Sequence, residues 1–323
     1  MSNSPPSYRH TILLSLVFVL LWNSGFIGAE YGLPYADPYS LVFWRYLVLT
    51  MVLAAYLLIR KRKHRFNIKK IGHASLVGLL SHGVWLSCVI ISIDYGVPAG
   101  IVALVIALQP MTTGLLAGYI TGEQTTKLQW FGLLTGFIGV AIALISRMDI
   151  GEAGSVDWVG YIIPFGSVLA ITLASLIQRR AEINDPDIVL PVDITLFYQS
   201  LATTIVSALP AYWLEGMAVE GDIVFYASML WLILGVSLAA YAVMWVLLSR
   251  MEATRVASLF YFGPPVTMLM GWAAFGDAIQ FTDITGMVVI AIGVLMIQQP
   301  KFLRTIPRKK AKAKLAKRKS VDL

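Results

Sequence analysis

Several apolar runs of this sequence, each long enough for a membrane-spanning helix, contain polar and aromatic side chains near their middle. Polar groups are costly in hydrocarbon, so they usually face the interior of a helix bundle, where they bind a solute, a proton or one another. We therefore take these side chains as candidate substrate-binding residues. They are Trp22, Asn23, Ser24, Arg45, His82, Trp85, Gln109, Thr172, Ser175, Tyr241, Trp245 and Tyr261.

Three of these side chains have specific chemistry. Histidine titrates near pH 6.5, so His82 suits a proton-coupled step, although a hydrogen-bonded structural histidine fits the position equally well. Trp85 shares the helix face of His82, three residues away. It can contact the apolar part or the cationic group of a solute, or pack against another helix. Arg45 can hold a carboxylate through two parallel hydrogen bonds, or form a structural ion pair with an acid.

Prolines interrupt two of the apolar runs. Pro110, Pro264 and Pro265 fall near the middle of these runs, where a proline removes a backbone hydrogen bond and kinks a helix. In lipid, the freed carbonyl needs a partner or a water-lined cavity. The prolines therefore predict either packing kinks or a hinge and cavity wall.

Glycines spaced by four follow the first of these prolines. Gly114, Gly118 and Gly122 lie on one helix face, and Gly132 and Gly136 repeat the spacing in the next run. Small residues on one face allow helices to approach closely. We expect all five glycines to serve packing.

The sequence lacks the motifs of several enzyme and ATPase classes. It has no Gly-rich loop followed by Lys-Ser or Lys-Thr, no His-Glu-x-x-His pair and no Gly-x-Ser-x-Gly elbow. The single cysteine, Cys88, lies inside an apolar run. We therefore expect no catalytic residue, no metal site, no cofactor and no enzymatic activity.

Composition indicates an all-α polytopic membrane protein. The chain is 58% hydrophobic and 13% charged, whereas soluble proteins have roughly 45–50% apolar and about 25% charged residues. We expect ten transmembrane helices, because an apolar run can cross a bilayer with about 20 residues. The expected spans are roughly 11–30, 39–59, 71–93, 98–120, 128–146, 158–178, 188–213, 224–249, 254–275 and 281–299.

Charge predicts the orientation of these spans. Nearly all Lys and Arg residues fall in alternate loops and in the tail, while the other loops are acidic. Basic loops stay in the cytoplasm. We therefore expect both termini to be cytoplasmic, and the compact loops favour a multi-pass protein of the bacterial inner (plasma) membrane.

The last segment, 301–323, is strongly basic. We expect a disordered cytoplasmic tail that fixes the orientation and that attracts anionic lipid headgroups. The tail has no interleaved aromatic residues and no fold around it, so we expect no nucleic-acid binding.

A stretch of the first half recurs in the second half. "ALQPMTTGLLAGYITGE" at 107–123 aligns with "YFGPPVTMLMGWAAFGD" at 261–277, at an offset of 154 positions, and "FWRY" aligns faintly with "FYQS" at 197–200. Five expected spans lie in each copy, and five is odd, so the second copy would be inverted. We therefore divide the chain into repeats 1–150 and 151–300. Inverted repeats are typical of secondary transporters.

These segments resemble the drug/metabolite transporter superfamily, EamA type. The resemblance covers about residues 11–299 and includes "LLWNSGFIGAEYGL", "DPYSLVFWRYLV" with the recurrent Arg45, and the Pro and Gly-acid pattern of both copies. It implies ten helices in two five-helix repeats and transport of small metabolites. Two departures are Glu30, where many relatives carry Lys, and Asp277, which replaces the usual Glu.

The sequence as a whole predicts a secondary active transporter. We expect it to move an amino acid-like or amphipathic solute, more often outward, by alternating access through a pocket among spans 1, 3, 4, 6, 8 and 9. The alternative is a lipid scramblase or a membrane sensor on the same scaffold. A closed central pocket would favour transport, and a lipid-facing polar groove would favour scrambling. We make no prediction of the oligomeric state.

Overall fold

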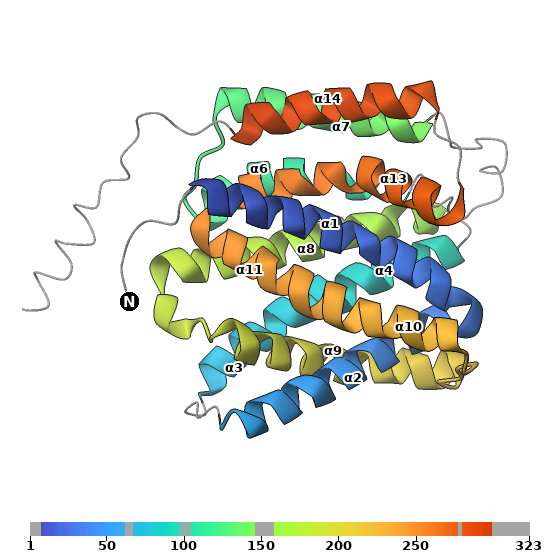
Figure 1. Cartoon of the computed structure of the whole chain (residues 1–323). Helices are drawn as coiled ribbons and strands as arrows, with labels where there is room; N and C mark the ends of the chain where they lie inside the picture. Colours follow the sequence, from blue (N-terminus) through green and yellow to red (C-terminus); the bar gives the residue numbers. More distant parts are fainter. Residues whose placement is uncertain are drawn as a thin grey trace, which may run out of the picture.

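The computed structural model describes residues 8–61, 67–95, 97, 102, 105–145, 158–276 and 280–298. Within these residues every regular element is a helix, as Figure 1 shows. The expected all-α class is therefore confirmed. The side chain of Glu30, residue Asp277 and the tail 301–323 lie outside the described part of the chain.

The helices follow the apolar runs of the sequence. The α-helices are α1 (Tyr8–Gly32), α2 (Pro38–Ile59), α3 (Ile68–Gly78), α4 (Trp85–Asp94), α6 (Gln109–Ile120), α7 (Lys127–Ile145), α8 (Trp158–Asn184), α9 (Val192–Glu215), α10 (Ile223–Trp231), α11 (Tyr241–Arg250), α12 (Ala253–Ser258), α13 (Gly263–Phe275) and α14 (Phe281–Gln298). The π-helical segments η2 (Leu79–Val84) and η5 (Leu232–Ala240) join α3 to α4 and α10 to α11. The 3-10 segments are η1 (Leu33–Tyr35), η4 (Pro186–Ile188) and η6 (Leu259–Phe262).

Six helical segments of the described chain are long and apolar enough to cross a membrane. They are Arg9–Ala29, Pro38–Ile59, Trp158–Asn184, Val192–Glu215, Ile223–Arg250 and Phe281–Gln298. A shorter apolar stretch covers Lys127–Ala143. The expected third and ninth spans are interrupted by η2 and η6, and α6 covers only the second half of the expected fourth span. The chain is a multi-pass helical membrane protein.

The long helices lie roughly alongside one another in one bundle (Figure 1). α7 packs against α14 at one edge, and α2 packs against α9 at the opposite edge. Between them, α1 packs on α10, η5 and α11, while α8 packs on α3, η2 and α4. α6 and α13 lie next to the α7–α14 pair.

One contact joins residues 154 positions apart, and others join helices that correspond in the alignment of the two halves. The hydroxyl oxygens of Thr50 in α2 and Thr204 in α9 lie 3.2 Å from each other at this separation. In the α7–α14 pair, a Cβ on Gly139 would lie 2.8 Å from the carbonyl oxygen of Gly286, and a Cβ on Gly293 would lie 2.7 Å from that of Gly132. The two aligned halves of the sequence therefore meet along both edges of the bundle.

The glycines of the expected packing faces do not all serve that purpose. A Cβ on Gly114 would meet Leu133 at 2.8 Å, and one on Gly136 would meet the Tyr261 ring at 2.6 Å. No described residue lies within 4 Å of a Cβ on Gly118 or Gly122. The packing prediction is therefore wrong for these two. Gly122 instead follows the end of α6 with a φ of +76°, the left-handed conformation that glycine adopts easily at helix ends.

The two π-helical segments lie in the interior of the bundle. π-helices are rare, and they often occur at functional sites because they widen one helical turn. η2 places Ser81 and His82 in the interior, and η5 does the same for Ser237; all three are at most 2% exposed. Each segment packs against a central helix: η2 packs on α8, and η5 packs on α1.

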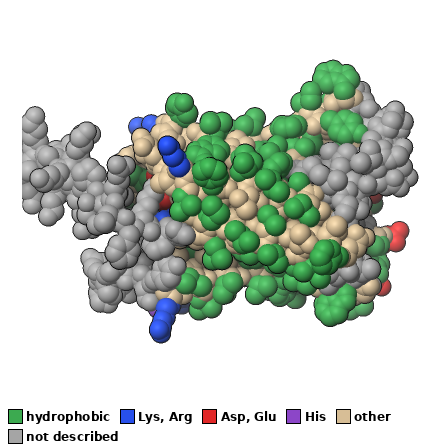
Figure 2. All heavy atoms as spheres, turned by 90° about the horizontal axis from the view of Figure 1, so that it is seen from above, with side chains coloured by type: hydrophobic (Ala, Val, Ile, Leu, Met, Phe, Trp, Pro, Cys, Tyr) green, Lys and Arg blue, Asp and Glu red, His purple; other side chains and the backbone are tan. Residues whose placement is uncertain are grey.

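The surface has the polarity of a protein in lipid. Figure 2 shows hydrophobic side chains spread over the middle of one face, with Lys and Arg at one end and acidic side chains at the other. Large apolar side chains such as Leu58, Leu209 and Trp213 are more than 60% exposed. Lipid solvates such a surface, whereas water would not.

Candidate functional site

The proline-marked breaks are starts of helices. Pro110 lies in the first turn of α6, and Pro264 and Pro265 lie in the first turn of α13. The N–H groups of a first turn have no partner within the helix, so proline costs little there. The expected proline kink in mid-helix is therefore replaced by helix junctions inside the bundle: α6 begins at one, and the 3-10 segment η6 passes directly into α13 at the other.

A cavity of about 540 Å³ lies at these two helix starts. This volume falls in the range of small-molecule sites, roughly 300–1,000 Å³. Seven of the residues singled out from the sequence line it: Trp22, Asn23, Trp85, Gln109, Pro110, Pro264 and Pro265. Its walls come from both aligned halves of the chain.

Aromatic rings form much of the cavity wall. The Trp22 and Trp85 rings are 6.0 Å apart, and the Phe260 ring meets Trp22 edge-on at 5.0 Å. Phe26 and Phe260 also line the cavity, although the sequence did not single them out. Such a wall suits the apolar part of an amphipathic solute.

A few polar groups interrupt this wall. Asn23 donates to the Val19 carbonyl at 2.6 Å, and its oxygen accepts from the Thr267 hydroxyl at 3.3 Å. Gln109 is 1% exposed, and its Nε2 has no hydrogen-bond partner among the described residues. A solute with a hydrogen-bond acceptor would satisfy this donor.

Asp283 is a wall residue that sequence reasoning missed. Its position at the start of the last span suggested a loop acid, but it is fully buried and lines the cavity. Its carboxylate accepts from the backbone N–H of Gln280 at 2.6 Å. This bond caps the first turn of α14 in the manner of a capping box.

A second polar cluster contains His82. The Tyr46 hydroxyl lies 2.8 Å from His82 Nδ1, and Gln199 Oε1 lies 3.4 Å from His82 Nε2. Trp245 Nε1 donates to the same Gln199 oxygen at 3.1 Å. Because an indole N–H only donates, it fixes which end of the Gln199 amide is the oxygen. We therefore assign the neutral His82 tautomer that donates from Nε2 and accepts at Nδ1.

Arg45 belongs to this cluster. Its Nε donates to the Ser237 hydroxyl at 2.6 Å, and its guanidinium carbon lies 5.6 Å from the centre of the Tyr46 ring. The cluster and the cavity share a wall, because Trp22 packs on Tyr241 at 4.9 Å and Tyr241 packs on His82 at 3.9 Å between ring centres. The structure thus brings Arg45, His82, Tyr241 and Trp245 together behind the cavity.

Four of the sequence-predicted residues lie elsewhere. Ser24 accepts from Trp231 Nε1 at 3.0 Å, and the Tyr261 hydroxyl donates to the Leu133 carbonyl at 2.9 Å. Thr172 is buried beside Thr113 at 3.5 Å, and Ser175 is buried in the same helix, α8. None of the four lines the cavity. The expected eighth span, 224–249, contributes to the His82 cluster and not to the cavity. Instead, α7 contributes Ala143 to the cavity and α14 contributes Asp283.

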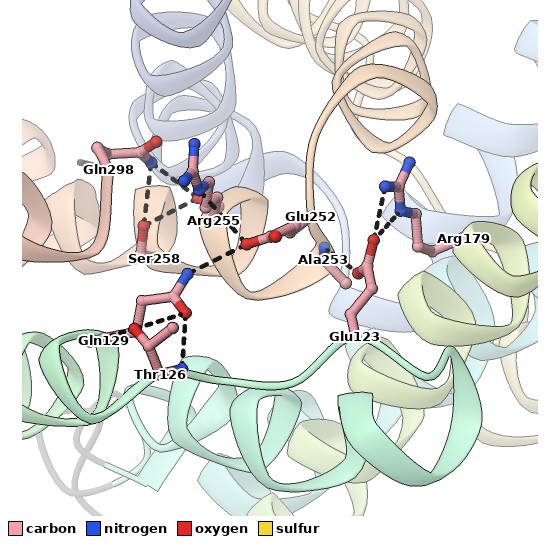
Figure 3. Close-up of polar contacts among 9 residues, drawn as sticks. All are labelled: Glu123, Thr126, Gln129, Arg179, Glu252, Ala253, Arg255, Ser258 and Gln298. Atoms are coloured by element: carbon pink, nitrogen blue, oxygen red, sulfur yellow. Dashed lines mark hydrogen bonds and ion pairs between the residues drawn. The ribbon is translucent and has the colours of Figure 1, made fainter. Parts of the chain in front are cut away.

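A third group of polar contacts ties helix ends together around Glu123 (Figure 3). One Glu123 oxygen accepts from Nε and Nη2 of Arg179 at 2.8 and 2.6 Å. The other oxygen accepts from the backbone N–H of Ala253 at 3.1 Å, and Arg179 also donates to the Leu248 carbonyl at 2.8 Å. Glu123 thus joins the loop after α6 to α8 and to the start of α12.

Gln129 makes a neighbouring connection in Figure 3. It accepts from the backbone N–H of Thr126 at 2.9 Å and donates to a Glu252 carboxylate oxygen at 3.2 Å. Gln298 at the end of α14 donates to the Arg255 carbonyl at 2.9 Å. These contacts hold the ends of α7, α12 and α14 together on the side where Glu123 lies.

Residues 9–145 match the sequence profile described as the EamA-like transporter family. The chain is 26% identical to a protein of Escherichia coli (strain K12) named uncharacterized inner membrane transporter YedA, over 88% of this chain and 89% of that one. It is 23% identical to the uncharacterized transporter YvbV of Bacillus subtilis (strain 168), over 90% and 92% of the two chains.

A further relative has a more specific name. The probable amino-acid metabolite efflux pump of Salmonella typhimurium (strain LT2) is 22% identical over 87% of this chain and 92% of that one. A solved crystal structure also aligns with a TM-score of 0.71 and 19% identity, over 90% of this chain and 98% of that one. At this identity the crystal structure supports the fold alone.

Proposed function

We propose that this chain belongs to the EamA-like transporter family, whose profile its residues 9–145 match, and that it is a secondary active transporter that moves a small metabolite by alternating access. The solute would be amino acid-like or amphipathic, and export is the favoured direction. The name of the Salmonella relative, probable amino-acid metabolite efflux pump, supports this choice of solute class. The substrate site is the cavity at the starts of α6 and α13.

One observation carries this proposal. The cavity lies where two helices, one from each aligned half of the chain, begin inside the bundle at Pro110 and Pro264. Transporters with repeats place the solute between the halves, next to interrupted helices. Movement of one half against the other would then open the cavity to each side in turn.

The repeats are part of the proposal. We propose ten spans in two inverted five-helix repeats, 1–150 and 151–300. The contact between Thr50 and Thr204 supports it, because it joins corresponding positions of the two halves. The contacts of Gly139 with Gly286 and of Gly132 with Gly293 support it as well, because each is the other with the two halves exchanged. So does the pairing of α1 with η5 and of α8 with η2.

The orientation follows from charge. With the basic loops and both termini in the cytoplasm of the inner membrane, α1 and α4 run outward, so the wall residues Phe26 and Val89 lie in the outer half. Glu123 and Arg179 then lie at the inner ends of their helices. We propose that the described conformation faces outward and that the contacts in Figure 3 hold its inner side closed.

Reconstitution into liposomes tests the function. We expect the purified full-length protein to exchange labelled solute across the bilayer in counterflow, with labelled amino acids, nucleosides and aromatic amines as probes. Empty liposomes are the control, and a fluorescent lipid reports flipping in the same vesicles. Lipid flipping without movement of any solute would refute the transporter and support the scramblase alternative. Neither activity would leave the sensor alternative.

Coupling to protons is a further part of the proposal, and we propose that His82 has a structural role and does not itself carry the proton. Both ring nitrogens of His82 have partners inside the protein, and a protonated ring would give up the bond accepted at Nδ1. We therefore expect His82→Gln to slow counterflow but to keep its wild-type dependence on pH between about 5 and 8. His73→Gln is the matched control in α3. Loss of the pH dependence in His82→Gln alone would show that His82 carries the proton.

A further inference from the structure

Arg45 is a buried cation in the first half of α2. The residue is only 8% exposed. Its guanidinium donates to the Ser237 hydroxyl at 2.6 Å and lies over the face of the Tyr46 ring. Among the described residues no carboxylate forms an ion pair with it, whereas Arg179 pairs with Glu123. The structural ion pair that the sequence left open is therefore not present in the described part.

A buried charge without a partner is strongly unfavourable. Removing an ion from water costs several kcal/mol even after relaxation of the protein, so buried charges are paired, hydrated or functional. The same polar cluster also holds an unused neutral donor. Gln199 is fully buried, its oxygen is used by Trp245 and His82, and its Nε2 has no partner among the described residues.

In the proposed repeat, the position that corresponds to Arg45 carries no charge. Gln199 in α9 lies 154 positions after Arg45 and holds the corresponding place in the second half. A neutral amide there packs against Gly78, whose added Cβ would lie 2.5 Å from the Gln199 Cβ, and it bonds its neighbours. The guanidinium of Arg45 therefore supplies a charge that packing alone would not select.

We propose that Arg45 binds a monovalent anion, and that this anion is the carboxylate of the transported solute. A guanidinium is complementary to a carboxylate group. The cluster lies directly behind the Trp22–Tyr241 pair, so the apolar part of the same solute has aromatic surface close by. This inference rests on the proposed function, since it names the solute class of the same transporter.

Ser237 offers a sharp test, because its hydroxyl already receives the Arg45 Nε. Ser237→Asp would place a permanent carboxylate at that position and occupy Arg45 from within the protein. Ser237→Asn is the matched control, since it has nearly the same size and no charge. Arg45→Gln removes the cation altogether. If Arg45→Gln fails to fold, the comparison of Ser237→Asp with Ser237→Asn still tests the inference.

Binding is measured as the shift of the thermal unfolding midpoint of the purified full-length protein in detergent, in a buffer without halide. The probes are benzoate and its neutral isostere benzamide, with sodium chloride as the inorganic anion. We expect benzoate alone to raise the midpoint of the wild type and of Ser237→Asn. In Ser237→Asp and Arg45→Gln we expect the apparent affinity for benzoate to fall at least about thirtyfold.

Three results would overturn the inference. They are an equal benzoate response in Ser237→Asp and Ser237→Asn, an equal response to benzamide, and a response to chloride as large as that to benzoate. Liposome counterflow of neutral and zwitterionic probes by the wild type is scored separately. Counterflow without benzoate selectivity would refute the anion site but leave the transporter, and benzoate binding without counterflow of any probe would refute the transporter.

Discussion

Gly293→Ala is expected to force α7 and α14 apart and to destabilise the folded protein. A Cβ at position 293 would lie 2.5 Å from the Gly136 nitrogen and 2.7 Å from the Gly132 oxygen. Both are backbone atoms, which cannot move aside as the end of a flexible side chain can. Insertion of one carbon into a packed contact costs about 1–3 kcal/mol, and rigid neighbours favour the upper part of this range.

Gly118→Ala is the matched control for this prediction. It makes the same change in the last turn of α6, where no described residue other than its own neighbours in the helix lies within 4 Å of the new carbon. Alanine is about 0.5–1 kcal/mol better than glycine inside a helix, so this variant should be as stable as the wild type or more stable. The fraction of monodisperse protein that survives heating in detergent measures both. Equal survival of the two variants would refute the contact between the α7 and α14 backbones.

The separation of these two glycines could not be predicted from the sequence. Gly118 belongs to a regular spacing of small residues, and the spacing identifies a helix face. Which neighbour covers that face depends on the packing of helices that are distant in the chain. Gly293 lies 154 positions after Gly139, so its helix corresponds to α7 at the offset of the repeat, and these two helices do meet in the bundle.

The sequence predicted how deep in the membrane the site residues lie, but not which side chains contact one another. Hydropathy placed His82 and Trp245 in the middle of apolar runs, and the structure brings both to one Gln199 oxygen. Gln199 was missed because an amide inside a long apolar run has no motif of its own. Its alignment with Arg45, through "FWRY" and "FYQS", was the only available signal.

The helix breaks were predictable in position but not in form. Pro110 and Pro264 marked the right places, because proline cannot donate within a helix. Whether the chain kinks or begins a new helix depends on the preceding residues, which are apolar and give no cap signal. The π-helical turns of η2 and η5 left no trace in the sequence, since η2 and η5 consist of ordinary helix-compatible residues.

Glu123→Gln is expected to open the inner side of the bundle. The carboxylate accepts three hydrogen bonds, two from Arg179 and one from the Ala253 backbone, and it is the one side chain in Figure 3 that joins α8 to the start of α12. Glutamine keeps the length but loses the charge and one acceptor oxygen. Hydrogen bonds to charged groups contribute about 1.5–3 kcal/mol each, so the loss of one shifts a two-state equilibrium about tenfold or more.

A buried cysteine in α12 reports this opening. In a Cys88→Ser background, Ala257→Cys lies one turn from Ala253 at a position that is 2% exposed. We expect a water-soluble maleimide to label it at least about tenfold faster when Glu123→Gln is also present, because opening exposes this face of α12. The measurement is the labelling rate of the purified protein in detergent.

Glu182→Gln is the control for Glu123→Gln. Glu182 accepts from Gln178 within α8 at 3.2 Å, so this change removes a carboxylate from the same region without cutting a connection between helices. Its labelling rate should equal that of the background. If both variants accelerate labelling alike, general loosening of the inner end explains the effect; if neither does, the Glu123–Arg179 contact does not close the inner side. A selective effect of Glu123→Gln would mean that one carboxylate, bound to two elements of the second half, controls access from the cytoplasm.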